Sequence, residues 1–159
     1  TNPAILIAGQ HNRSLQLQNI PDQEQWITKT ITQLRAITDR PIHIRSHPRC
    51  NLNLARLPKD IVVVQPKKLD NTYDSFNIHF DYHAVVNYNS GPGTQAGIAG
   101  TRPITDISSL AHPVSVDIDK IDEPYSVDRY KWLVEICHTE YTVDELRRGL
   151  WLNRLEKAL

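Results

Sequence analysis

Short apolar runs separated by turn residues mark the first two thirds of this chain. Four of them are long enough to form strands: Ala4–Ala8, Pro41–Arg45, Asp60–Gln65 and His83–Tyr88. Because apolar residues follow one another in most of these runs instead of alternating with polar ones, the pattern predicts strands that are buried on both faces. The shorter segment Arg102–Thr105 is a fifth candidate strand.

Helical periodicity lies between the strand candidates. Trp26 or Ile27, Ile31 and Leu34 recur at helical spacing after Pro21-Asp22, which predicts a helix that ends before Pro41. A weaker helical pattern covers residues 73–80, and a segment of small residues after the fourth strand predicts a helix that ends at Ala99. Strands that alternate with helices predict an α/β fold, a Rossmann-like parallel sheet with helices on both faces.

The last third of the chain has a different character. Residues 106–125 form a predicted loop with two prolines, and an apolar stripe predicts a helix over about 127–138. Thr142 and Glu145 have the spacing of a capping box, which predicts a last helix that continues through Leu155. We therefore expect a single domain over 1–159, with an α/β core in 1–105 and a loop with C-terminal helices in 106–159.

The fourth strand runs into a turn rich in glycine, Ser90-Gly91-Pro92-Gly93-Thr94, and then into a helix. Such a turn leaves backbone N–H groups at the positive end of the helix dipole, where a phosphate can bind. The candidate binding residues are Ser90, Gly91, Gly93, Thr94 and Gln95. A plain strand-to-helix turn that needs glycine explains the same residues equally well. No lysine follows to complete a Walker A motif.

Two further polar loops follow strands. Gly9-Gln10 follows the first strand, where a glycine allows close approach of a ligand and an amide can bond it. The second strand ends at Arg45-Ser46-His47-Pro48-Arg49, where Arg45 and His47 are candidate catalytic residues because guanidinium and imidazole groups neutralise or protonate phosphate. Because the carboxyl ends of parallel strands share one edge, these loops and the glycine turn predict one binding crevice. The alternative interpretation is that these loops are solvated turns whose charged residues bind no ligand.

Composition narrows the class of protein. The chain has 159 residues, 18 basic and 18 acidic, so its net charge does not by itself indicate nucleic acid or an anionic membrane as a partner. No apolar run approaches the roughly 20 residues of a membrane span. Cys50 and Cys137 form no disulfide framework, which favours a reducing, cytoplasmic location. Two histidine pairs, 43/47 and 79/83, lack a third ligand, so we expect no metal.

Taken together, these segments resemble the nucleotide-sugar-binding, C-terminal half of GT-B glycosyltransferases. The resemblance rests on Gly9-Gln10, Trp26, Arg45-x-His47-Pro48 and the run from Asn89 to Pro103, in that order. It is greatest to phage-encoded glycosyltransferases and to capsule-polysaccharide transferases with an HP motif. The tail, from Asp128-Arg129-Tyr130 to Trp151, is similar to the end of the phage type.

The resemblance implies roles for the site residues. Ser90, Gly93 and Thr94 would hold the diphosphate of a nucleotide-sugar donor, while Arg45 and His47 would supply charge and a proton donor. Gln95 stands where the family usually has glutamate, which often bonds a hydroxyl of the donor. The donor is a co-substrate, so no cofactor is implied, and the location would be the host cytoplasm for a phage-encoded enzyme.

GT-B enzymes react between two Rossmann-like halves, and this chain has the length of one half. We therefore expect either a piece of a longer glycosyltransferase or a non-catalytic nucleotide-binding or assembly module. In either case a partner domain or a homodimer could cover the exposed cleft, and the acceptor, DNA or polysaccharide among others, stays open. An epimerase or hydrolase on the same fold is the third alternative.

Overall fold

We describe the protein from a computed structural model. The structure describes residues 3–17, 22–50, 52–53, 55, 57–65, 67–68, 76–77 and 81–156. Two compact units divide the chain, Thr1–Ser126 and Val127–Leu159.

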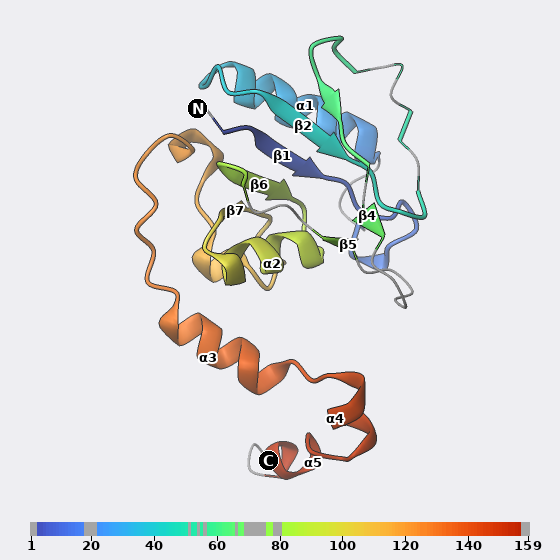
Figure 1. The fold of residues 1–159 in the computed structure, drawn as a ribbon, viewed down its shortest axis with the longest axis vertical. Coiled ribbons are helices and arrows are strands. Elements are labelled where there is room, and N and C mark those ends of the chain that lie inside the picture. The colour runs from blue at the N-terminus through green and yellow to red at the C-terminus, as the bar shows by residue number, and fades with distance from the viewer. Residues whose placement is uncertain are drawn as a thin grey trace. The chain divides into compact units, whose positions relative to one another are not determined.

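The first unit is built on a parallel sheet, as the apolar runs predict (Figure 1). Five strands form it within the described residues, in the order β3-β2-β1-β6-β7. Their bounds are Ile5–Ala8 (β1), Ile42–Arg45 (β2), Val62–Val63 (β3), Ala84–Asn87 (β6) and Arg102–Ile104 (β7). The chain moves outward from β1 to β3, then crosses back to place β6 on the other side of β1, so the strand order reverses between β1 and β6. The fold is therefore an α/β, Rossmann-like fold.

Helices cover both faces of this sheet, which confirms the prediction (Figure 1). Helix α1 (Gln23–Arg35) begins at Asp22, whose side chain accepts a hydrogen bond from the Glu24 N–H. Its residues Ile27, Ile31 and Leu34 pack on the isoleucines of β1 and β2. Helix α2 (Gly91–Ala99) covers the opposite face, where Ala96 packs with Leu6 and Val85.

Two predictions about the segment between β2 and β6 are wrong. Strand β3 is two residues long, and its Val62 is 48% exposed, because the strand lies at the edge and pairs only with β2 among the described strands. The helix expected over residues 73–80 falls mostly outside the described residues. Its described part, Phe76–Asn77 (β5), pairs antiparallel with Lys67–Lys68 (β4) and is therefore a strand.

Residues 106–126 belong to the sheet unit. They contain two short 3-10 helices, η3 (His112–Val114) and η4 (Ile118–Lys120). Val116 and Ile118 pack against the same core that α1 covers. A third such helix, η1 (Leu15–Leu17), lies in the loop after β1.

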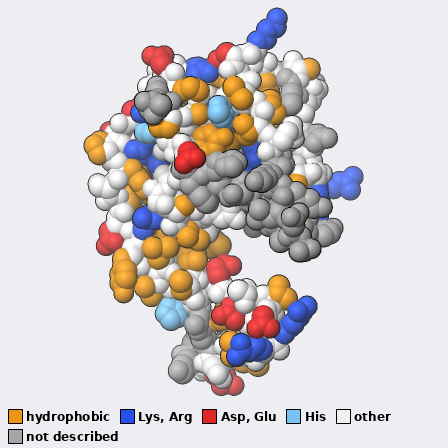
Figure 2. Space-filling model, viewed as in Figure 1, with side chains coloured by type: hydrophobic (Ala, Val, Ile, Leu, Met, Phe, Trp, Pro, Cys, Tyr) orange, Lys and Arg blue, Asp and Glu red, His pale blue; other side chains and the backbone are white. Residues whose placement is uncertain are grey.

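The second unit consists of helices. Helix α3 (Tyr130–Thr139) buries Trp132, and its Tyr130 is 76% exposed. Hydrophobic side chains gather over this helix on the face shown in Figure 2. The predicted capping box is confirmed at α4 (Val143–Arg147). The prediction of a single last helix is wrong, however, because Gly149 adopts φ 70° and separates α4 from α5 (Leu152–Leu155). No helix in the described part of the chain has the length and apolar character to span a bilayer.

Candidate functional site

Asn87, the last residue of β6, connects three pieces of the sheet edge. Its side chain is almost completely buried, at 1% exposure. The amide nitrogen donates to the carbonyl of Ala8, at 3.2 Å, and to the hydroxyl of Ser90, at 2.9 Å. The amide oxygen accepts from the Ser90 N–H at 2.9 Å. One side chain therefore joins the end of β1 to the turn that precedes α2.

Gln10 lies across the point where the strand order reverses. Its side-chain nitrogen donates to Asn89 Oδ1 at 2.9 Å and to Ser14 Oγ at 3.2 Å. Its backbone N–H donates to the side-chain oxygen of Gln23. Asn89 in turn donates to Ser108 Oγ at 2.9 Å. These bonds hold the loops after β1, β6 and β7 side by side at the carboxyl edge.

A cavity of about 410 Å³ opens at this edge. In α/β sheets, the carboxyl edge at a reversal of strand order is the usual place for a ligand. We call this space the edge cavity; it is lined by Gln10, His11, Arg13, Ser14, His47, Arg49 and Ser90.

The lining of the edge cavity is basic. It contains two arginines and two histidines, and none of the described residues that line it is acidic. The rings of His11 and His47 meet edge to face, with their centroids 5.3 Å apart. Because the whole chain carries no net charge, this concentration of basic groups is local and suits an anionic ligand.

The structure brings three of the predicted site residues together. Gln10, His47 and Ser90 come from three different loops, and all three line the edge cavity. Gly9 lies just before Gln10 and donates its N–H to the Arg45 carbonyl at 2.7 Å. A Cβ at Gly9 would lie 3.0 Å from Gln23 Oε1, so the glycine allows close packing of β1 on α1.

Arg45 lies outside the lining of the edge cavity. It is the last residue of β2 and is only 4% exposed. Ile42 and Ile44 face the core under α1, and side chains alternate along a strand, so Arg45 faces the side of α2. Burial lowers the pKa of Arg45 to about 10, partly offset by Tyr82, and the group is still protonated at neutral pH.

The N-terminus of α2 offers few backbone donors. The Ser90 N–H donates to Asn87, Pro92 has no N–H, and the Gly93 N–H donates to the Ser90 carbonyl at 3.2 Å. Of the predicted turn residues, only Ser90 lines the edge cavity, whereas Gly91, Gly93, Thr94 and Gln95 do not. Gly93 serves packing, because a Cβ there would lie 2.7 Å from Thr105 Cγ2.

Sequence reasoning did not select His11, Arg13 and Ser14, and it named Arg49 only as part of a motif. One signal could have found His11, Arg13 and Arg49. A histidine is followed two residues later by an arginine in the loops after both β1 and β2, at 11/13 and at 47/49. These loops lie side by side because β1 and β2 are paired strands.

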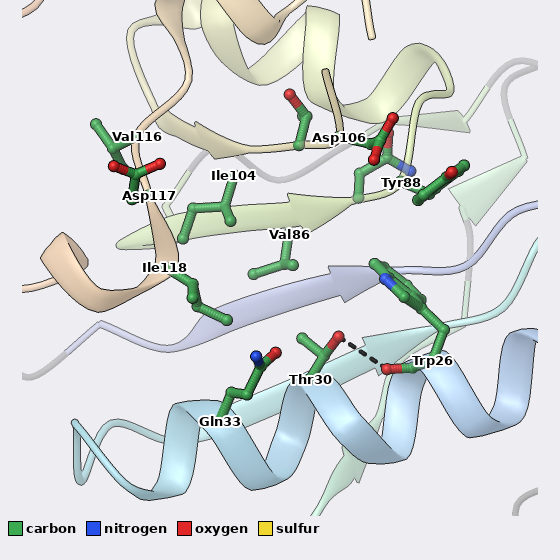
Figure 3. A pocket seen from close by; sticks show the side chains of 12 residues that line it. Trp26, Thr30, Gln33, Val86, Tyr88, Ile104, Asp106, Val116, Asp117 and Ile118 are labelled. Carbon is green, nitrogen blue, oxygen red and sulfur yellow. Dashed lines mark hydrogen bonds between the residues drawn. The ribbon is translucent and has the colours of Figure 1, made fainter. Parts of the chain in front are cut away.

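A second cavity, of about 250 Å³, lies on the face of the sheet covered by α1. Figure 3 shows Trp26, Thr30 and Gln33 rising from α1 toward the sheet residues Val86 and Ile104. Asp106 and Asp117 also line this space, which we call the face pocket. None of its described lining residues is basic, so it does not suit a phosphate.

No group of three or more His, Cys, Asp or Glu side chains is placed to hold a metal ion among the residues that the structure describes. Comparisons with protein-family models, with curated proteins and with solved structures find no match to this chain. The fold and the site thus define a class, a Rossmann-like α/β unit with a basic cavity at the reversal of its strand order.

Proposed function

We propose that this chain binds a nucleotide-sugar in the edge cavity and acts as the donor-binding domain of a glycosyltransferase. The observation that carries the proposal is the meeting of Gln10, His47 and Ser90, from three separate loops, in one cavity. The order of the motifs along the chain, which resembles the donor half of GT-B glycosyltransferases, supports the sugar-nucleotide as the anion.

The chemistry of such a site is electrostatic. A departing nucleotide accumulates negative charge, and donors fixed in advance around it stabilise that charge. His47 and the arginines of the edge cavity supply these donors, and the network through Asn87, Gln10 and Asn89 holds the loops in place. Arg45 adds a buried positive charge at the end of β2 without lining the cavity.

A non-catalytic nucleotide-binding module is the second candidate. The observation that favours it is the absence of a carboxylate from the described lining of the edge cavity. A transferase that activates an acceptor hydroxyl commonly uses a carboxylate or a histidine as the base. In this chain His47 would have to act as that base, or another domain would supply it.

Calorimetric titration with UDP-glucose, GDP-mannose and CMP-sialic acid tests the proposal. We expect micromolar binding of at least one donor and a loss of about tenfold, or about 1.4 kcal/mol, in His47→Ala. His138→Ala removes an exposed histidine from α3 and is the matched control, expected to bind like wild type. No binding at millimolar donor, or equal binding by His47→Ala, would contradict the proposal.

Incubation with a bound donor then separates the two candidates. Release of the free nucleotide in the presence of an acceptor extract indicates transfer. Stable binding without turnover indicates the non-catalytic module.

A further inference from the structure

The loops after β1 and β2 contain two turns of the same construction. In His11-Asn12-Arg13, the Nδ1 atom of His11 accepts the N–H of Arg13 at 3.0 Å. In His47-Pro48-Arg49, the Nδ1 atom of His47 accepts the N–H of Arg49 at 3.1 Å. Each turn therefore presents one imidazole and one guanidinium, and all four side chains line the edge cavity.

The hydrogen bond within each turn determines how its histidine can act. A neutral imidazole whose Nδ1 atom accepts a hydrogen bond carries its proton on Nε2, which makes Nε2 a donor. The same bond limits rotation of the ring. Each turn thus pairs a fixed imidazole donor with the donor fork of an arginine, a combination that suits one phosphate group.

The two turns are neighbours because their strands are neighbours. Ala8 of β1 pairs with Arg45 of β2 in register, so the two chains leave the sheet at the same level. The rings of His11 and His47 then meet at 5.3 Å with planes 84° apart. Two sets of phosphate donors consequently lie next to each other, which is the arrangement that two linked phosphates need.

The N-terminus of α2 does not compete strongly for the same anion. The N–H groups of Ser90 and Gly93 donate to the Asn87 side chain and to the Ser90 carbonyl, Pro92 has no N–H, and Gly91 does not line the edge cavity. Ser90 is the contribution of this helix terminus to the lining of the edge cavity. The edge cavity therefore receives four basic side chains from the two turns and one hydroxyl group from the residue before α2.

We propose that the two His-x-Arg turns form a diphosphate clamp, in which each turn holds one of two linked phosphate groups. The inference rests on the proposed function for the rest of the ligand and narrows it. The donor is a sugar joined to a nucleoside diphosphate, rather than to a nucleoside monophosphate. His11, Arg13 and Arg49 thereby become binding residues beside His47.

Titration with inorganic pyrophosphate and with inorganic phosphate tests the clamp without the nucleoside. We expect pyrophosphate to bind at least about tenfold more tightly than phosphate, at fixed ionic strength. Arg13→Ala and Arg49→Ala should each weaken pyrophosphate by about tenfold and reduce its preference over phosphate. The pyrophosphate affinities of Arg13→Lys and Arg49→Lys should fall between those of wild type and the Ala variants, since an ammonium group keeps the charge but loses the paired donors of the guanidinium.

Arg147→Ala is the matched control, because it removes an arginine from the exposed surface of α4. Thermal melting checks that each variant is folded; Arg13 and Arg49 are themselves exposed, so we expect melting like wild type. Equal affinity for phosphate and pyrophosphate, or arginine variants that bind like the control, would overturn the clamp.

The two proposals fail separately. A nucleotide-sugar that binds equally well to wild type and to Arg13→Ala would overturn the clamp and leave donor binding intact. Pyrophosphate that binds through both arginines, with no affinity for any nucleotide-sugar, would support the clamp and contradict the donor-binding function.

Discussion

Asn87 shows how much of the site depends on one uncharged residue. Its amide satisfies both a strand carbonyl and the turn that precedes α2, at 1% exposure. A buried amide that loses such partners leaves their polar groups unsatisfied, which costs about 1–3 kcal/mol for each. In the sequence it is simply the polar residue after an apolar run, and no local pattern shows that one of its partners is the Ala8 carbonyl of β1.

His83 belongs to a polar cluster at the opposite, amino end of the sheet. Its Nε2 atom lies 2.7 Å from the Ile121 carbonyl and 3.4 Å from Asp122. Arg102 bonds the carbonyls of Ile121 and Glu123, and Arg40 pairs with Asp122 at 2.6 Å. The cluster attaches the segment after η4 to the strands β6 and β7.

This cluster leads to a pH dependence of stability. Burial lowers the pKa of His83; the bond to Ile121 and the charge of Asp122 act the other way, and Arg102 and Arg40 add to the lowering. The unfolded chain therefore binds the proton more readily than the folded one. The contribution of His83 to the free energy of unfolding is complete above about pH 6.5 and is lost as the pH falls below it.

We expect the urea midpoint of wild type to fall between about pH 7 and pH 5, and the His83→Gln variant to fall less steeply. The slope does not vanish, since burial also lowers the pKa of His43. His138→Gln, on the exposed side of α3, is the control and should keep the wild-type slope. Equal slopes in wild type and His83→Gln would refute this account of the cluster.

At the scale of elements, the local sequence predicted the structure well where a capping residue or a glycine marks the end of a helix. Asp22 caps α1, Gly100 ends α2 with φ 86°, and Thr142 and Glu145 form the capping box. Predictions failed where contacts with distant parts of the chain, and not the local sequence, determine the position of an element. The apolar run around Val62 looks like a central strand, yet it lies at the sheet edge, and nothing local places it there.

Gly93 provides a test of how α2 packs on the sheet. A Cβ at this position would lie 2.7 Å from Thr105 Cγ2 and 3.3 Å from Asn87 Oδ1. Gly93→Ala should therefore lower the free energy of unfolding by about 1–3 kcal/mol, the usual effect of overpacking. The urea midpoint, with an unchanged m-value, measures this loss.

Gly91→Ala is the matched control on the same turn of the helix, because an added Cβ there meets no atom within 4 Å apart from its chain neighbours. Alanine is the better helix former, but Pro92 disfavours a helical conformation in a preceding residue that carries a Cβ, so we expect Gly91→Ala to lower the free energy of unfolding less than Gly93→Ala does. A Gly93→Ala variant as stable as Gly91→Ala would mean that α2 is not packed as described.

At the scale of the whole molecule, the convergence of the loops could be anticipated from the sequence, but its chemistry could not. Parallel strands bring their following loops to one edge, so Gln10, His47 and Ser90 were expected to meet. Arg45 was expected there as well. Arg45 is the last residue of β2, however, and the alternation of side chains along the strand directs it to the face of the sheet that α2 covers. Arg13 and Arg49 line the edge cavity instead.

The account depends on the edge cavity as the place where a donor binds. Backbone amide chemical-shift mapping with a nucleoside-diphosphate sugar tests this most directly. We expect the amides of residues 10–14, 46, 47, 49, 89 and 90 to shift together, with one dissociation constant. Shifts that gather instead around Asp106 and Asp117 of the face pocket, or no shifts in the three loops, would contradict the account.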